Sequence, residues 1–289
     1  MAKRRILAGG LTLFLLLRLL PGFAGFWQEG ISLPLLGMLR EMGRHIPFVL
    51  LEVLGIAAGI FLFFSLLRRR FLRNIARMML GLFIAYLALW YPLYFTAEVK
   101  YTAQAAQIAG LCEAFIDIFN ASAPDFDKQP ELPAKTACFP GWMRLFRVDG
   151  FCSFFTGEAI VSPGLHPGVL PFIAMHERMH LEGVAGEGAA NIAAWNSCME
   201  LGGIYADSAR LWALRCGMGT LKRADRDLYS ACMQRMDADT WRIFQSSGGS
   251  RNTAEASFLH RAFYRLMGIE AAAQDYEILV HYLAAGLPQ

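Results

Sequence analysis

Three long apolar stretches dominate the first third of the 289-residue chain. They cover residues 6–26, 46–67 and 78–97. About 20 predominantly apolar residues cross the hydrocarbon core of a bilayer as a helix, so each stretch is long enough to span it. The third contains no charged residue, and near its end it carries aromatic side chains typical of the membrane–water interface, namely Trp90, Tyr91 and Tyr94. The pattern predicts three transmembrane helices followed by a region outside the bilayer (98–289).

The first stretch has a second interpretation, because basic residues at positions 3–5 precede it as they precede a secretory signal peptide. Small-residue cleavage candidates lie only around Gly22–Gly25. The apolar run is long for a signal peptide, which favours an uncleaved helix in which Arg18 extends toward the headgroups.

The distribution of charge predicts the orientation. Residues 1–97 hold 11 Lys and Arg against 3 Asp and Glu, whereas the remainder holds 16 against 21. The basic residues gather at the N-terminus and in the loop between the second and third stretches, which carries Arg68, Arg69, Arg70, Arg73 and Arg77. Short cytoplasmic loops carry an excess of Lys and Arg, so the N-terminus and this loop are expected in the cytoplasm. Residues 98–289 are then expected outside the cell membrane.

Composition agrees with a membrane protein. Hydrophobic residues make up 55% of the chain and charged residues 18%, whereas soluble domains carry about 25% charged residues. The net charge of +3 is too small to indicate nucleic acid as a partner. The lipid bilayer is the expected partner, and the sequence predicts no oligomeric state.

All six cysteines lie in the predicted exterior region, at positions 112, 138, 152, 198, 216 and 232. An even number there permits disulfide bonds in an oxidising compartment, although the pairing is not determined. Free buried thiols are the equally open alternative. Because no CxxC pair is present, a cysteine zinc site has little support.

The exterior region is predicted to be mainly helical with a small β element. Residues 98–120 read as a helix that could continue the third membrane helix, and the proline-rich segment 121–142 reads as an irregular connection. The aromatic and β-branched run at 144–161 predicts one or two strands or a hairpin. Further helices are expected at about 170–182, 187–209, 208–217, 224–236, 254–266 and 271–285.

One short motif carries candidate chemistry. Residues 176–180 read His-Glu-Arg-Met-His, an HExxH pattern in a stretch compatible with a helix. The spacing places His176 and His180 on one face, where both imidazoles can bind one Zn²⁺. Glu177 then lies near the open coordination position and can act as the general base, taking a proton from metal-bound water. The same pentapeptide also occurs in helices whose histidines are only solvated or hydrogen-bonded.

A catalytic zinc needs a third protein ligand. Glu187 follows the motif after Gly183 and Gly186, which can end the first helix and turn the chain back. We expect a second helix that presents Glu187 to the metal, with Asn191 one turn later in position to hydrogen-bond a ligating histidine. The alternative is that Glu187 is an acidic residue in a first helical turn, favoured by the helix dipole. Glu182 is a weaker ligand candidate, because it faces away on a continuing helix.

The segment 150–191, GFCSFFTGEAIVSPGLHPGVLPFIAMHERMHLEGVAGEGAAN, resembles an uncharacterised bacterial family of membrane-anchored zincin-like proteins. That family shows a GxxxPFTGEA-like strand, then LPF, HExAH, a glycine, an acidic residue and Ala-Asn. More broadly, the segment is similar to gluzincin peptidases, whose HExxH is completed by a Glu in an ExxxD/N pattern that Glu187 and Asn191 match. The resemblance implies zinc-dependent cleavage of peptide bonds, with the strand 151–160 as the edge along which a peptide lies.

The chain departs from this family at three positions. Met179 replaces an Ala, Ala189 replaces a second acidic residue, and Phe154 replaces a Pro. None of these changes removes a catalytic group, and the second makes Glu187 the only nearby choice for the third ligand.

A peptidase also needs a group that stabilises charge on the substrate carbonyl oxygen. Tyr276 is the first candidate, because it lies where the resembling family carries a Ser-Tyr pair. The other candidates are His260, Tyr264 and His281, all on predicted late helices. The alternative for Tyr276 is an aromatic core position among neighbouring apolar residues.

Together these features predict a multi-pass membrane protein with an extracytoplasmic zincin-like domain that binds Zn²⁺ and cleaves a peptide or protein substrate. The first alternative is a membrane-anchored binding or scaffold protein with a degenerate or structural metal site. A structural zinc would need a fourth ligand that the sequence does not show. A further alternative is zinc-dependent hydrolysis of an amide that is not a peptide.

Overall fold

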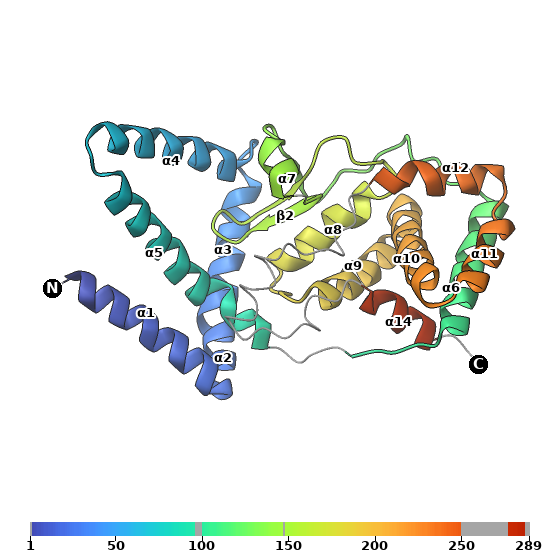
Figure 1. The fold of residues 1–289 in the computed structure, drawn as a ribbon, viewed down its shortest axis with the longest axis horizontal. Helices are drawn as coiled ribbons and strands as arrows, with labels where there is room; N and C mark the ends of the chain where they lie inside the picture. The colour runs from blue at the N-terminus through green and yellow to red at the C-terminus, as the bar shows by residue number, and fades with distance from the viewer. Residues whose placement is uncertain (1, 96–99, 147, 250–276, 287–289) are drawn as a thin grey trace.

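The computed structural model describes residues 2–95, 100–146, 148–249 and 277–286. It is mainly helical, with one small three-stranded sheet, as the sequence predicts. Figure 1 shows helices α1, α4 and α5 on one side and helices α6, α8 to α12 and α14 on the other, with α3, α7 and the sheet between them.

Two helical segments are long and apolar enough to cross a membrane: α4 (Leu50–Leu67), and α5 (Phe71–Leu89) together with a 3₁₀ turn (Tyr91–Phe95). Only 11% of α4 is buried within the protein, and Phe61, Phe63 and Phe64 are exposed on it. A soluble protein rarely exposes so continuous an apolar surface. These helices therefore fit a protein anchored in a membrane.

The first apolar stretch is not the single helix predicted for residues 6–26. Helix α1 (Ala2–Leu19) ends before Pro21, and α2 (Pro21–Trp27) continues through a π-helical turn (Gln28–Ser32) into α3 (Leu33–Arg44). The two arms meet at 116°, and the protein has three candidate spans if this bent pair counts as one. The break follows from Pro21, because proline cannot donate a helical hydrogen bond and disfavours helical geometry at Leu20, whose φ is −124° and ψ 88°.

Two further boundaries differ from the prediction. Helix α5 begins seven residues before position 78, so Arg73 and Arg77 lie on the helix and the basic turn is only Arg68–Arg70. The run after Arg70 contains no Gly or Pro until Gly81, so nothing in it opposes helix formation. Residues 100–104 are not helical, so α6 (Ala105–Ala121) does not continue the membrane helix.

The predicted hairpin is present. Strands β2 (Gly150–Ser153) and β3 (Glu158–Val161) pair antiparallel, with Phe151 opposite Ile160, and β1 (Lys135–Thr136) pairs parallel to β3. The order β1-β3-β2 makes β2 an edge strand of the described sheet, whereas β3 is central. The edge expected along 151–160 is therefore only the β2 half of that segment. A short helix α7 (Gly141–Phe146) precedes β2.

Most of the exterior region is helical. The described helices are α8 (Leu170–Leu181), α9 (Glu187–Leu201), α10 (Gly203–Ala224), α11 (Arg226–Arg235), α12 (Ala238–Ser246) and α14 (Ile278–Ala285). The single helix predicted for 187–209 is wrong, because Gly202 adopts a φ of +70° and separates α9 from α10. Helix α12 was not predicted, although Asp237 marks its start by accepting a hydrogen bond from the Thr240 amide. The predicted helix at 254–266 lies outside the described residues.

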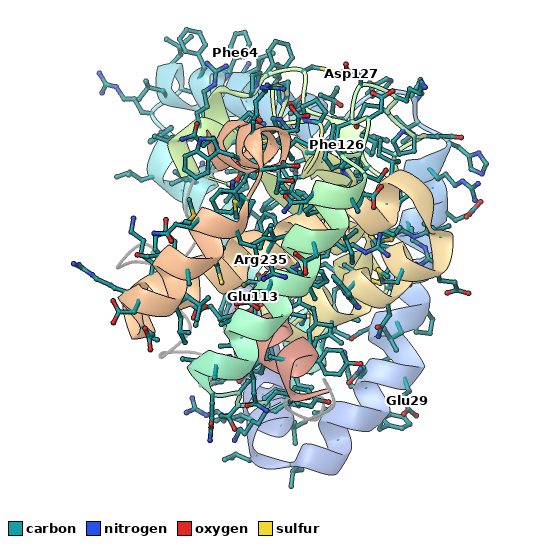
Figure 2. The ribbon with its side chains drawn as sticks, turned by 90° about the vertical axis from the view of Figure 1, so that its right-hand side faces the viewer. Glu29, Phe64, Glu113, Phe126, Asp127 and Arg235 are labelled. Atoms are coloured by element: carbon teal, nitrogen blue, oxygen red, sulfur yellow. The ribbon has the colours of Figure 1, made fainter. Side chains whose placement is uncertain are left out.

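Helices α6, α8, α9 and α10 enclose the main core, in which α8 is buried on almost every side. On the outer face, α11 lies against α6, and Arg235 forms two hydrogen bonds with Asp117. Figure 2 shows this face with Glu113 and Arg235 close to each other across the two helices. The core fixes α8 and α9, which carry the predicted chemistry, relative to the sheet.

Two buried carboxylates connect α4 to residues 98–289 through hydrogen bonds. Glu158 on β3 accepts hydrogen bonds from the amides of Leu50 and Leu51 at the start of α4, at 2.7 and 2.9 Å, and from Lys135 Nζ at 2.7 Å. In the opposite direction, Glu52 on α4 accepts from the amides of Cys138 and Phe139 and from the indole of Trp142.

Helix α3 also packs directly on the β2–β3 turn. Gly157 there has a φ of +66°, and a Cβ at this position would lie 2.2 Å from the carbonyl carbon of Leu39. Only glycine permits both this conformation and this close approach. Helices α3 and α4, which belong to the candidate membrane spans, are thus in direct contact with residues 98–289 through main-chain atoms.

Candidate metal centre

Helix α8 places both motif histidines on one side, as the spacing predicts. The Nε2 atoms of His176 and His180 lie 3.1 Å apart, and both side chains are buried. Pro171 occupies the first turn of α8, where proline is tolerated, and the amide of Phe172 donates to Ser208 Oγ on α10. The helix start is therefore fixed by its own sequence and by the neighbouring helix.

Glu187 joins the histidines because the chain turns back after α8. Gly183 has a φ of +97°, which favours glycine, and α9 begins at Glu187. The Oε2 atom of Glu187 lies 3.1 Å from His176 Nε2 and 3.5 Å from His180 Nε2. The predicted third ligand is therefore in contact with the other two.

These three side chains fit a zinc ion. Zinc bonds to nitrogen and oxygen are about 2.0–2.2 Å long, so ligand atoms in a tetrahedral site are separated by about 3.3 Å. The observed separations of 3.1, 3.1 and 3.5 Å match this value. Two imidazoles and one carboxylate are also a ligand set that occurs at catalytic zinc. Among the described residues, His176, His180 and Glu187 form the only such cluster of three potential ligands.

Neighbouring groups orient the ligands. The Nδ1–H of His180 donates to the Val184 carbonyl at 2.6 Å, which leaves the Nε2 lone pair directed at the cluster. Burial alone would lower the pKa of His180, but the adjacent Glu187 carboxylate outweighs burial and raises it to about 9. In turn, the two histidines hold the pKa of Glu187 far below its usual range, although burial opposes this. His176 Nδ1 is buried without a hydrogen-bond partner in the described part of the chain.

Glu177 lies beside the cluster against the edge strand. Its carboxylate approaches Gly150 on β2 so closely that a Cβ at that position would be 2.3 Å from Oε1. The side chain is buried, and burial raises its pKa despite the nearby histidines. No described residue donates a hydrogen bond to it. A buried carboxylate with a raised pKa and no fixed partner has the properties of a general base.

The cluster opens into a cavity of about 310 Å³. Glu177, Glu187 and the two histidines form its polar wall, and the β2 strand and Phe154 line another part. The remaining walls carry aromatic residues of the α5 end and of α10, including Tyr86, Trp90, Tyr94 and Trp212. The sequence identified Trp90 and Tyr94 only as interfacial residues, and it did not single out Tyr86 or Trp212.

A family model described as a protein of unknown function, DUF3810, matches residues 104–265, which is more than half of the chain. The chain belongs to the DUF3810 family. Comparisons with curated proteins and with solved structures gave no match. The matched region of this DUF3810 protein contains all three clustered side chains and Glu177, whereas the candidate membrane spans precede it.

The remaining predicted site residues fall into three groups. Asn191 is buried one turn after Glu187 and lines the same cavity, and its hydrogen bond to a ligating histidine stays a prediction. Tyr276, His260 and Tyr264 lie outside the described residues. His281 does not line the cavity, because its Nδ1 accepts a hydrogen bond from the Ala103 amide at the start of the α6 region.

Glu182, the weaker ligand candidate, lies outside the cluster, and so does His166. Glu182 pairs on the surface with Arg178 at 3.0 Å. His166 accepts a hydrogen bond from the Gly168 amide within its loop and contacts Ser246 Oγ at 3.0 Å.

All six cysteines of the DUF3810 protein are free thiols in the structure. Cys112, Cys198 and Cys232 are buried, and burial raises the pKa of each. Cys152 lines the cavity, where burial and the carboxylates of Glu177 and Glu187 raise its pKa. No two of these cysteines are joined in the structure, only three of the six are buried, and the raised pKa favours the neutral thiol at Cys152.

Proposed function

We propose that this DUF3810 protein is a membrane-anchored, zinc-dependent metallopeptidase. The observation that carries the proposal is the convergence of His176, His180 and Glu187 at tetrahedral spacing, beside the buried carboxylate of Glu177. The resemblance of residues 150–191 to zincin-like proteins supports the same reaction.

His176 Nε2, His180 Nε2 and Glu187 Oε2 would hold the ion. When bound, zinc supplies a Lewis acid and lowers the pKa of a coordinated water. Glu177 would take up a proton from the attacking water at a carboxylate oxygen and would deliver it to the leaving amine. Its buried position beside the three ligand atoms, against strand β2, supports this role.

Strand β2 would hold the substrate. An extended peptide can add to an exposed sheet edge through main-chain hydrogen bonds, and β2 is the edge strand next to Glu177. Because Gly150 has no side chain, the Glu177 carboxylate lies directly against this strand. A peptide paired with β2 would therefore pass close to both Glu177 and the metal ligands.

The arrangement favours catalysis over a structural metal. A structural zinc is closed by four protein ligands, whereas the described cluster offers three and faces a cavity. An open position next to a general base is what hydrolysis requires.

The proposed location is the outer face of the cell membrane. The start of α1 and the basic turn Arg68–Arg70 both lie at the side of the protein away from α8 to α14 (Figure 1). Basic residues favour the cytoplasmic side, so this placement supports a cytoplasmic N-terminus and an extracytoplasmic cavity.

Metal analysis tests the proposal. The full-length protein is purified in detergent as wild type, Glu177→Gln, Glu187→Ala and the surface control Glu182→Ala, and each is incubated with zinc and desalted. We expect about one zinc per chain in the wild type, Glu177→Gln and Glu182→Ala, and a large loss in Glu187→Ala only. Absence of zinc from the folded wild type would contradict the proposal, and so would full retention by Glu187→Ala.

A further inference from the structure

One wall of the cavity belongs to the membrane segment. Tyr86 and Trp90 lie at the end of α5, and Tyr94 lies in the 3₁₀ turn that extends it. The ring of Trp90 stacks on Phe154 at 5.4 Å and meets the ring of His180 edge-on at 5.9 Å. A ring from the candidate membrane span therefore touches a proposed metal ligand.

The candidate span α5 places this wall at the level expected for the surface of a bilayer. Aromatic residues at the end of a membrane helix lie at the level of the headgroups. The hydrogen bonds of Glu52 and Glu158 tie the neighbouring helix α4 to the sheet that carries Gly150. The metal ligands are thus held close to the membrane surface, rather than on a flexible stalk.

The described lining of the cavity disfavours anionic ligands. Its carboxylates are those of Asp149, Glu177 and Glu187, and no Lys or Arg lines it in the described part of the chain. Lipid phosphates and free C-terminal carboxylates would find no cationic partner apart from the metal. The aromatic walls instead suit an uncharged apolar side chain.

A hydrogen-bond donor for the substrate lies on the part of the cavity wall that α10 forms. The Nε1–H of Trp212 is buried and has no hydrogen-bond partner among the described residues, while its ring stacks on Phe172 at 5.4 Å. An unsatisfied buried donor is costly, and a carbonyl group of a bound ligand would satisfy it. This pairing of an apolar surface with one donor matches a polypeptide.

We propose that the substrate is a membrane-anchored polypeptide, cleaved close to the bilayer surface, whose uncharged aromatic or aliphatic side chain binds in the cavity against the stacked rings of Trp90 and Phe154. This inference rests on the proposed metallopeptidase function and names its substrate class. Trp90 determines specificity, and Trp212 positions the chain through a carbonyl group.

The test measures binding and cleavage by full-length, zinc-loaded protein in nanodiscs of phosphatidylethanolamine and phosphatidylglycerol. The probes are synthetic peptides with one Leu-rich membrane segment followed by a ten-residue tail that contains either three Phe or three Asp. A third peptide carries the Phe tail without the membrane segment. The two anchored peptides share the same concentration in the disc, so a difference between them reports recognition and not partitioning.

Binding is measured on Glu177→Gln, which is expected to keep zinc but not to cleave, and cleavage is measured by mass spectrometry on the wild type. We expect the anchored Phe peptide to bind at least tenfold more tightly than the anchored Asp peptide, and to be cut within its tail. Adding Trp90→Ala to Glu177→Gln should abolish this preference, and adding Trp212→Phe should weaken binding severalfold. The control Trp241→Ala, at an exposed position on α12, should change neither.

Several results would overturn the inference. Equal binding of the Phe and Asp tails, or equal cleavage of the free and anchored Phe peptides, would reject the substrate class and leave the metallopeptidase intact. Stronger competition by N-palmitoyl phosphatidylethanolamine than by any peptide would assign an amide lipid instead. Loss of zinc binding by the wild type would reject the proposed function and this inference with it.

Discussion

Two pairs of glutamates are held in different ways in this DUF3810 protein. Glu52 and Glu158, at the joint between α4 and the sheet, are buried, and each accepts hydrogen bonds from several donors. Glu187 is half-buried and contacts two imidazoles, and the buried Glu177 receives no hydrogen bond from any described residue. Because both carboxylates of the second pair line the cavity, they are accessible to a ligand, whereas those of the first pair are already satisfied by the protein.

The two pairs of glutamates are expected to differ most at Glu177, where substitution should lower activity without lowering stability. Glu177→Gln should lower kcat for the cleaved peptide by about 10³-fold, since general-base catalysis contributes roughly 10²–10⁴. The melting temperature should stay equal or rise, because the change removes a buried carboxylate without a donor. Kinetics and thermal melting of zinc-loaded protein check both parts, and a large fall in melting temperature would assign Glu177 a structural role.

The opposite behaviour is expected at Glu158. Glu158→Gln breaks a buried pair with Lys135 and should destabilise the protein by about 3 kcal/mol, as removing one partner of a buried ion pair does. Burial favours a raised pKa at Glu158, but the hydrogen bonds from Lys135, Thr156 and the start of α4 outweigh it, and the pKa is lowered from 4.5.

A carboxyl group whose pKa is lowered by folding stabilises the protein above its unfolded pKa, and this stabilisation disappears as the pH falls through the folded pKa. The stability difference between wild type and Glu158→Gln should therefore be full at neutral pH and shrink below about pH 4.5. Denaturant titrations at several pH values measure it. A difference that grows in acid would mean that the pKa of Glu158 is raised instead.

Gly150 lies where the sheet meets the candidate metal centre. Because it has no side chain, the Glu177 carboxylate lies directly against β2. Gly150→Ala should displace that carboxylate and lower kcat by about 100-fold, since a displacement of about 1 Å at a reacting group costs this much. Zinc content should be unchanged. The control Gly164→Ala changes a loop glycine whose added Cβ would contact nothing, although its φ of +81° makes a modest loss of stability expected there. Unchanged kcat in Gly150→Ala would show that Glu177 does not depend on this contact.

The sequence predicted the convergence of His176, His180 and Glu187 better than the surroundings of this cluster. The spacing of His176 and His180 and the glycines before Glu187 were sufficient, because a helical turn and a positive φ are local properties. The break at Pro21 was also a local signal, but the apolar composition of residues 6–26 concealed it. The aromatic wall was not predictable, since Trp90 and Trp212 are separated by 122 positions and only packing brings them to one cavity.

The smallest expected change in stability concerns two single hydroxyl groups. Thr156 is buried, and its Oγ1 lies 2.7 Å from Glu158 Oε2, to which it donates. Thr240 is also buried, but among the described residues its Oγ1 interacts only with the exposed Asp237 carboxylate. Replacing a satisfied hydroxyl by a methyl group of similar size should cost about 1 kcal/mol, so Thr156→Val should be destabilised by this amount in denaturant titration. Thr240→Val should cost less, because it loses only the interaction with an exposed carboxylate. Equal losses in the two variants would show that the hydrogen bond from Thr156 to Glu158 makes no specific contribution to the joint between α4 and the sheet.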